Sequence, residues 1–100
     1  MHAKILIKRK FVKGKKKEII ALLKELRTGA LSRPGYISGQ TLASCEEPQT
    51  LMVIGTWQDI ESWRNWQEND TRKTLEKMLE TYQDGSTEYQ EYILGGFIEE

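Results

Sequence analysis

The stretch Gly55-Thr-Trp-Gln-Asp-Ile-Glu-Ser-Trp-Arg-Asn-Trp66 decides the fold, because a β-prone apolar run turns into a helix within it. The run Leu51-Met-Val-Ile-Gly-Thr-Trp57 has the composition of a strand and ends at the first of three tryptophans. Asp59 can cap the following helix, since its carboxylate can accept hydrogen bonds from the free amides of the first turn. We therefore predict a strand, a short connection and a helix that carries Trp63 and Trp66.

The residues before this stretch predict two strands and a helix. The run Lys4-Ile-Leu-Ile-Lys-Arg-Lys-Phe-Val12 is β-prone and is predicted to form the first strand. Apolar residues at helical spacing from Lys15 to about Leu26 predict an amphipathic helix, which Thr28-Gly29 is expected to end. Residues 33–43 open with a Pro-Gly turn and are expected to form a hairpin with the strand at 51–57.

The second half predicts a helix in two parts and a last strand. Its apolar residues fall into 60–66 and 75–82, separated by the polar break Glu68-Asn-Asp70, where Asn69 can cap the second part. Residues 89–94 alternate enough to form a fourth strand. The order β-α-β-β-α-β gives a ferredoxin-like α+β sandwich, a four-stranded antiparallel sheet with two helices on one face. We expect residues 1–100 to form a single domain.

The other face of this sheet is also expected to carry apolar side chains that are buried by a further contact. In the first strand Ile5 and Ile7 share one face, while Leu6 lies on the other. The second face is expected to carry several further apolar side chains besides Leu6, namely Ile54 or Val53, Tyr92 and Leu94. Two copies of the chain are therefore predicted to pack sheet to sheet as a homodimer.

Composition indicates a soluble globular protein. Of the 100 residues, 38% are hydrophobic and 30% are charged, which differs from the composition of disordered chains. No apolar run approaches the roughly 20 residues that a membrane-spanning helix needs. The first residues lack the long apolar segment and cleavage site of a signal peptide, so we expect no membrane partner and a cytoplasmic location.

Opposite charges are concentrated in the two halves of the chain. Residues 1–50 carry 11 basic and 4 acidic side chains, a net +7, and residues 51–100 carry 4 and 11, a net −7. Seven of the ten residues from Lys8 to Lys17 are basic, which raises the question of a phosphate or nucleic-acid site. The acidic half screens that field, and no interleaved aromatic surface accompanies the lysines. We therefore favour a solvated helix start, or charge pairing with the acidic half or a partner subunit, and expect no nucleic-acid partner.

Several common chemistries are not expected because their residues are missing. The single cysteine, Cys45, cannot form an internal disulfide, and the single histidine, His2, lies at the terminus. A histidine base, a histidine triad and a histidine-rich metal site are therefore improbable, and the carboxylates show no metal-ligand spacing. The glycines match neither the dinucleotide nor the P-loop pattern, and no nucleophile elbow is present. We expect neither a metal nor a bound cofactor.

The tryptophans remain as the candidate ligand site. Trp63 and Trp66 are three residues apart on one helix, so both can face the space between this helix and the sheet, near Trp57. Trp63, in register with Ile60, is predicted to be a core residue, whereas Trp66 lies at the edge before the polar break. Core packing and a ligand pocket are both open interpretations of this cluster. A wall of tryptophan and tyrosine suits a flat aromatic ligand, which can stack on the rings.

In order and spacing, the whole chain resembles the antibiotic biosynthesis monooxygenase domain family, whose members are dimeric α+β barrels. The resemblance rests on Lys13-Gly14 before the first helix, Pro34-Gly35-Tyr36 at the second strand, and Trp57-x-Asp59 leading to Trp63-x-x-Trp66. It implies a homodimer and a monooxygenase, which is an oxidoreductase. The family includes cofactor-independent monooxygenases of phenolic polyketides, quinol monooxygenases, haem-degrading monooxygenases and many members of unknown activity.

The haem-degrading branch of the family uses residues that this chain lacks. There the site looks like an asparagine in the first strand, a tryptophan on the second helix and a histidine ligand later on that helix. Trp66 matches the tryptophan, but Ile7 stands at the asparagine position and Glu76 at the histidine position. Without an imidazole to hold the iron, haem binding or degradation is the least favoured hypothesis.

In the cofactor-independent branch, the substrate supplies electrons to dioxygen, and the protein deprotonates and positions the substrate. Trp66 again matches the expected tryptophan, while Ser62 stands where an amide is often found and Asn65 should face elsewhere. The resemblance implies a cofactor-independent monooxygenase of an aromatic or quinol-type molecule, with Trp66 as a catalytic residue. The alternative is a small-molecule-binding dimer of the same fold without catalysis. Substrate contacts are expected from Ser62, Trp63, Tyr36 and Tyr92.

Overall fold

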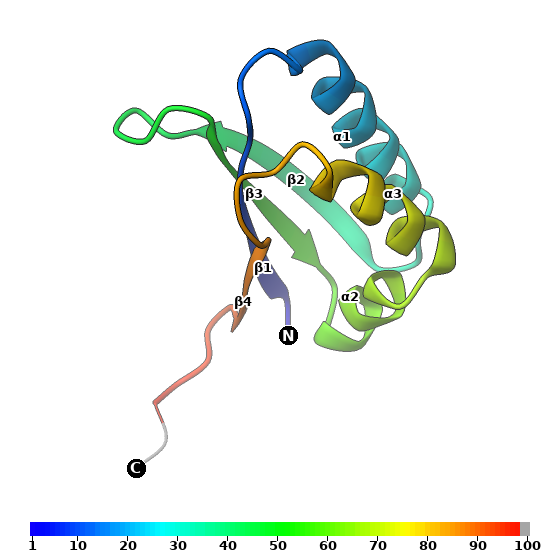
Figure 1. Ribbon diagram of the computed structural model, residues 1–100. Coiled ribbons are helices and arrows are strands. Elements are labelled where there is room, and N and C mark those ends of the chain that lie inside the picture. Colours follow the sequence, from blue (N-terminus) through cyan, green and yellow to red (C-terminus); the bar gives the residue numbers. More distant parts are fainter. Residues whose placement is uncertain (99–100) are drawn as a thin grey trace.

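The computed structural model describes residues 1–98, which form a four-stranded sheet with three helices on one of its faces (Figure 1). The elements in chain order are β1 Ala3–Lys10, α1 Lys16–Leu31, β2 Tyr36–Ala43, β3 Thr50–Trp57, α2 Ile60–Gln67, α3 Asp70–Glu80 and β4 Glu88–Ile93. The predicted β-α-β-β-α-β order is confirmed, with the second helix divided into α2 and α3. Within residues 1–98, no helix has the length and apolar character needed to cross a membrane.

The sheet has the order β2-β3-β1-β4, and each neighbouring pair of strands runs antiparallel. β2 and β3 form the expected hairpin, whereas the helices connect β1 to β2 and β3 to β4. This arrangement is the ferredoxin-like fold that the element order predicted. β1 is a central strand, because it is hydrogen-bonded to β3 on one side and to β4 on the other.

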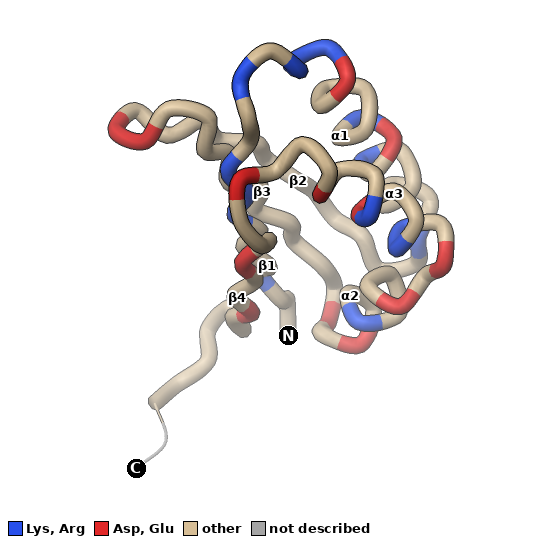
Figure 2. Tube along the Cα trace, viewed as in Figure 1, with Lys and Arg blue, Asp and Glu red and all other residues tan. Residues whose placement is uncertain are grey.

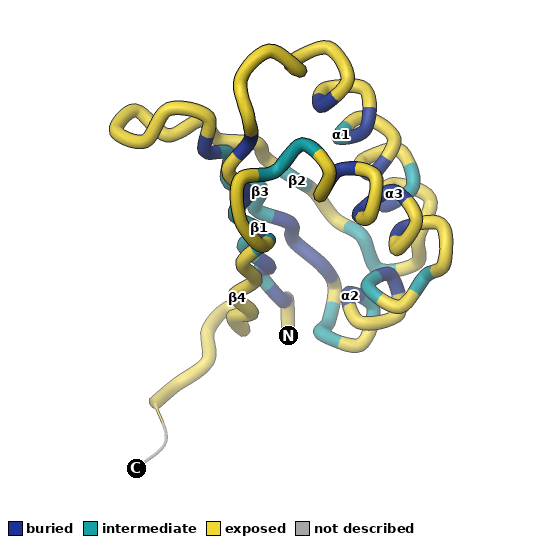
Figure 3. The backbone as a smooth tube through the Cα atoms, in the orientation of Figure 1, coloured by how far each residue is buried: buried dark blue, intermediate teal, exposed yellow. Residues whose placement is uncertain are grey.

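The side chains of β1 alternate between the two faces of the sheet. Ala3, Ile5, Ile7 and Arg9 are buried under the helices, whereas the three residues between them are only half-buried. Figure 3 shows the buried segments along the inner side of the sheet and the facing sides of the helices. The core therefore lies between the sheet and the helices, and an arginine is one of its members.

The outer face of the sheet, turned away from the helices, carries exposed apolar side chains. Ile54 pairs with Leu6 and lies on this outer face, whereas Val53 pairs with Ile7 and faces the helices. This settles which of the two adjacent residues, Ile54 or Val53, belongs to the second face. No helix described over residues 1–98 covers it. Besides Leu6 and Ile54, the apolar residues on the outer face are Leu42, Met52 and Tyr92.

Side-chain caps define the starts of α2 and α3, as the sequence predicts. The Asp59 carboxylate accepts a hydrogen bond from the Ser62 amide at 2.8 Å, and the Asn69 side chain accepts one from the Arg72 amide at 3.1 Å. Hydrogen bonds from the Ser62 side chain and amide lower the pKa of Asp59 below its ordinary value. The two caps determine where the chain bends, and so where the side chains of α2 and α3 meet the sheet.

The predicted end of the first helix is wrong. α1 continues through Gly29 to Leu31, and the Ser32 hydroxyl donates a hydrogen bond to the Gly29 carbonyl at 2.8 Å. A glycine inside a helix is tolerated where packing requires its missing side chain. Gly29 is such a case, because a side chain from α2 lies directly against it.

The oppositely charged halves of the sequence meet within one chain. Arg9 forms an ion pair with Glu76, and Lys10 Nζ lies 3.8 Å from Asp84 Oδ2. Lysines 13 and 15–17 are exposed around the start of α1, and Lys8 is half-buried on the outer face of β1 (Figure 2). The basic run therefore contains a buried arginine among solvated lysines rather than one continuous basic surface.

Replacing Asn69 by alanine should lower the free energy of unfolding by about 1 kcal/mol, because the Arg72 amide loses its capping partner. Asn69→Asp is the matched control, since aspartate and asparagine cap about equally well. Urea denaturation of the three proteins measures the difference. An alanine variant as stable as the wild type would contradict a structural role for this cap.

Candidate functional site

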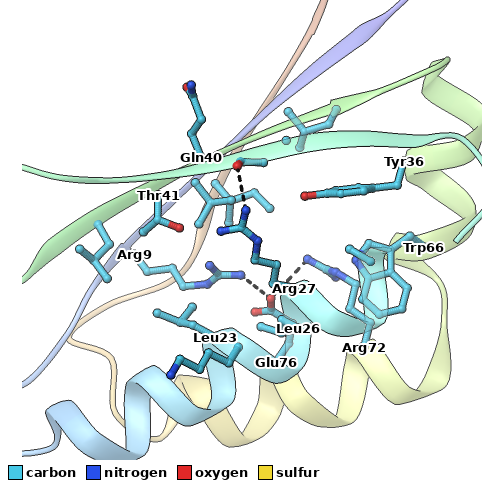
Figure 4. Close-up of a pocket in the computed structure, with 18 of the residues that line it drawn as sticks. Arg9, Leu23, Leu26, Arg27, Tyr36, Gln40, Thr41, Trp66, Arg72 and Glu76 are labelled. Carbon is cyan, nitrogen blue, oxygen red and sulfur yellow. Dashed lines mark hydrogen bonds and ion pairs between the residues drawn. The ribbon is translucent and has the colours of Figure 1, made fainter. Parts of the chain in front are cut away.

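A cavity of about 290 Å³ lies between α1 and the inner face of the sheet, and α2 and α3 contribute to its wall (Figure 4). The sequence placed the candidate site between the second helix and the sheet, so α1 contributes more of the wall than expected. The volume is close to the lower end of the roughly 300–1,000 Å³ of small-molecule pockets. A ligand of one or two rings is therefore the size that this cavity suits.

Most of the cavity wall is apolar. Aliphatic side chains come from β1, β3 and α1, among them Ile5, Ile7, Val53, Leu23 and Leu26. Four aromatic rings complete this part of the wall: Tyr36, Trp57, Trp63 and Trp66. Such a surface has the shape and polarity that suit contact with a planar hydrophobic molecule.

Trp66 reaches the cavity from the last turn of α2 and packs against α1. A Cβ atom on Gly29 would lie 2.6 Å from Cη2 of Trp66, so the indole occupies the space of a missing side chain. Trp66 is 5% exposed, which means that its ring lies almost entirely inside the protein. Gly29 therefore permits the close approach of α1 and α2 and determines where the Trp66 ring lies.

Trp57 and Trp63 belong to a connected aromatic cluster. Ring centroids are 5.1 Å apart for Tyr36 and Trp57, and 6.1 Å apart for Trp57 and Trp63. The Trp63 indole N–H donates a hydrogen bond to Glu91 Oε2 at 2.8 Å, which ties α2 to β4. Trp63 is 1% exposed and is the core residue that the sequence predicts, although one part of its ring lines the cavity.

Three buried charged residues form the polar end of the cavity. Glu76 Oε1 accepts hydrogen bonds from Arg9 of β1 and, at 3.4 Å, from Arg72 of α3. Arg72 also donates to the Tyr89 hydroxyl at 2.9 Å, and its guanidinium carbon lies 5.1 Å from the Trp63 ring centroid. Arg9 Nε and Glu76 Oε2 are buried without a hydrogen-bond partner. One donor and one acceptor of the cluster therefore lack the partner that a buried polar group needs.

Sequence reasoning did not identify this charged cluster. Arg9 lies within the lysine run and shares its basic character, although its alternation with Ile5 and Ile7 places it on the inner face. The sequence distinguishes Glu76 only by its place where part of the family has a histidine. No local signal indicates that the two residues meet, since 67 positions separate them.

Three of the five predicted site residues line the cavity, namely Tyr36, Trp63 and Trp66. Ser62 does not: its hydroxyl lies against Gly35 and contributes to the Asp59 cap, so it serves the start of the helix. Tyr92 does not either, because it lies on the outer face of the sheet and is 53% exposed. The hydroxyl that does point into the cavity is that of Tyr36, which lies over Gly39 (Figure 4).

The haem-degrading form of the site does not fit these residues. Glu76, at the position of the family's histidine ligand, shares Oε1 between two guanidinium groups. It offers no imidazole nitrogen to an iron, and Ile7 provides no amide. Over residues 1–98, no three histidine, cysteine, aspartate or glutamate side chains gather in a way that could hold a metal ion.

The fold and the cavity together define a ferredoxin-like α+β protein with an aromatic-lined cavity between its sheet and helices. Residues 3–78 match the model of the family described as antibiotic biosynthesis monooxygenase. The chain therefore belongs to the antibiotic biosynthesis monooxygenase family. No curated protein matches it.

Solved structures share this fold at low sequence identity. A conserved protein from Methanosarcina mazei Go1 has a TM-score of 0.85 and 24% identity, over 92% of this chain and 91% of that one. SnoaB, a cofactor-independent oxygenase from Streptomyces nogalater, has a TM-score of 0.80 and 14% identity over 100% of both chains. At these identities, the likeness establishes the fold rather than the activity.

A Gly29→Ala substitution should destabilise the protein by about 1–3 kcal/mol, because the new methyl group overlaps the Trp66 ring. The sign of this change distinguishes the clash from helix propensity, because alanine in place of glycine inside a helix otherwise stabilises a protein by about 1 kcal/mol. Urea denaturation gives the difference in the free energy of unfolding.

Trp66→Phe provides the control for this clash. The smaller ring leaves room for the methyl group, so adding Gly29→Ala to Trp66→Phe should cost less than adding it to the wild type. Equal costs in both backgrounds would contradict the contact between Gly29 and Trp66.

Proposed function

We propose that this protein is a cofactor-independent monooxygenase that acts on an aromatic or quinol-type small molecule. The observation that carries the proposal is the position of Trp66 in the wall of an apolar cavity that also holds an unpaired buried donor and acceptor. Membership of the antibiotic biosynthesis monooxygenase family supports it. The likeness in fold to SnoaB, a cofactor-independent oxygenase, is consistent with it.

In the proposed reaction, the quinol supplies all of the electrons that dioxygen accepts. One oxygen atom forms a bond to a ring carbon, the other leaves as water, and the quinol becomes a hydroxyquinone. The protein has to ionise a ring hydroxyl and hold the ring close to dioxygen in an environment that excludes bulk water. The apolar wall of the cavity can hold the ring away from bulk water, and its charged end can assist the ionisation.

The described residues divide these tasks. The ligand hydroxyl donates to the free Oε2 of Glu76, which receives the proton, and the positive charge of the Arg9 and Arg72 guanidinium groups beside Glu76 stabilises the oxyanion that results. The Trp66 ring limits where the substrate and its oxygenated intermediate can lie. The Tyr36 hydroxyl, which points into the cavity from β2, supplies a further hydrogen bond (Figure 4).

Oxygen uptake with a panel of benzoquinols and naphthoquinols tests this function. The wild type should consume oxygen above the rate of autoxidation, and Trp66→Phe should be slower by about 10- to 100-fold because the substrate is less well positioned. With labelled dioxygen, mass spectrometry should find one labelled atom in the product. Tyr92→Phe is the matched control, since this aromatic residue lies on the outer face and should not alter the rate. Background uptake by the wild type and by Trp66→Phe alike would refute the catalytic proposal.

A second candidate function is binding of the same class of molecule without turnover. The position where the family often has an amide is held by Ser62, and its hydroxyl is used at the start of α2 rather than in the cavity. Saturable binding of a quinol together with background oxygen uptake would favour this function. Oxygen uptake by the wild type above the background rate would exclude binding without turnover.

We also propose that the protein is a homodimer formed through the outer face of the sheet. Leu42 and Tyr92 are 47% and 53% exposed there, and Leu6 and Ile54 lie between them on the central strands. Exposed apolar side chains on a sheet face are a frequent site of association between identical chains. Family membership supports the same arrangement.

Light scattering after size-exclusion chromatography tests the dimer. The wild type should elute with twice the mass of one chain, and Ile54→Lys should shift it toward one chain, because the lysine places a charge in the apolar contact. Leu31→Lys is the matched control, since Leu31 is 61% exposed on α1 and outside that face. A wild type that stays monomeric at high concentration would contradict this proposal.

A further inference from the structure

The cavity carries an excess of positive charge. Four basic side chains and one acidic side chain line it, a net of +3, and they are Arg9, Lys24, Arg27, Arg72 and Glu76. We propose that the cavity selects aromatic ligands that carry a carboxylate, and that Arg9 is the residue that binds this group. The inference rests on the proposed function only in placing the substrate in this same cavity.

Arg9 has the position and the free donor that such an anchor needs. It follows Ile5 and Ile7 on the inner face of β1, and it is 4% exposed. Only one of its terminal nitrogens donates to Glu76, while Nε has no partner. A buried guanidinium with an unused N–H is unfavourable in isolation, whereas a carboxylate can take two parallel hydrogen bonds from its edge. A carboxylate therefore completes the hydrogen bonding of this residue.

Arg72 is held by contacts to Glu76, Tyr89 and Trp63, and it serves to position these neighbours. It donates to Glu76 and to the Tyr89 hydroxyl, and its guanidinium carbon lies 5.1 Å from the Trp63 ring centroid and 5.6 Å from that of Tyr89. These contacts hold Glu76 from the side opposite to Arg9 (Figure 4). Glu76 thus balances one of the two buried arginines and leaves one positive charge without a counterion.

Two further cations lie at the exposed side of the cavity. Lys24 and Arg27 are exposed residues of α1, and Arg27 Nη2 lies 3.5 Å from the Gly39 carbonyl of β2. That distance is at the limit of a hydrogen bond, so the contact is readily released. The positive charge at this side attracts anions to the cavity, and the buried Arg9 then holds them in a less polar environment.

A neutral ligand is expected to bind this cavity more weakly than a carboxylate of the same shape. An uncharged quinol of the same shape makes the same ring contacts but leaves the buried positive charge without a counterion. The expected preference for a carboxylate over a neutral isostere is therefore about tenfold or more in the dissociation constant.

Isothermal titration calorimetry with 2-naphthoate and 2-naphthamide tests the proposal on the full chain. The two probes share their rings and size and differ in charge. The wild type should bind naphthoate about tenfold more tightly. Arg9→Gln should abolish this preference, and Arg9→Lys should keep part of it. Arg33→Gln is the matched control, because it removes an exposed arginine outside the cavity wall and should leave the preference intact.

Glu76→Gln separates this role from a purely structural one. Loss of a structural ion pair would weaken binding of both probes. Removal of a negative charge beside a carboxylate site should instead tighten naphthoate binding by about three- to tenfold and leave naphthamide unchanged. This variant and the wild-type ratio still decide the question if Arg9→Gln fails to fold.

Two results would overturn the proposal. One is a wild type that binds naphthamide as tightly as naphthoate or binds neither, and the other is an Arg9→Gln protein that folds and keeps the preference. Failure of the oxygenase proposal is recognised separately, because a preference for naphthoate together with background oxygen uptake leaves the anion site in place.

Discussion

The contact on which much of this structure depends is the buried carboxylate of Glu76 between the guanidinium groups of Arg9 and Arg72. It joins the central strand β1 to α3, and through Tyr89 it reaches β4 as well. Buried ion pairs gain little over well-packed apolar groups, but removing one partner from such a pair typically costs about 3–5 kcal/mol. The cluster therefore does more to determine how α3 lies on the sheet than to stabilise the fold, and it brings buried charge to the end of a cavity whose wall is mostly apolar.

A second constraint keeps that cavity open. The indole of Trp66 rests on Gly29, and the Tyr36 hydroxyl rests on Gly39, so in both places an aromatic group occupies the space of a missing side chain. Both rings lie near the C-terminal end of α1, because Gly29 is in its last turn and Tyr36 follows shortly after it. The rest of the cavity wall is left largely to aliphatic side chains that do not fill the space. The cavity is thus a consequence of where the bulky and the small residues stand along α1, α2 and β2.

Much of the fold could be predicted because its signals are local. The Asp59 and Asn69 caps, the β-prone runs and the Pro-Gly turn each depend on a few adjacent residues, and the structure contains all of them. The site could be predicted only in part, because it is made of contacts between distant segments. Locally, Gly29 has the pattern of a helix end, because its packing partner Trp66 belongs to a distant segment. Arg9 likewise has the local pattern of the lysines around it. Period-two alternation along β1 contained the missing information on Arg9, whereas nothing local placed Glu76 beside it.

The charges of the cavity also affect two steps of the proposed oxidation, the ionisation of the bound hydroxyl and the transfer of its electrons to dioxygen. Positive charge favours ionisation of a bound hydroxyl, but an oxyanion that is stabilised too strongly gives up its electrons to dioxygen less readily. Glu76 offsets one arginine and offers Oε2 as the proton acceptor, while the Nε of Arg9 remains a buried donor without a partner. A carboxylate on the ligand would engage that donor and lower the remaining positive charge, leaving the reacting oxygen less strongly held. On this view, the anion that positions the substrate also preserves its reducing power, so substrate selection and reactivity depend on the same arginine.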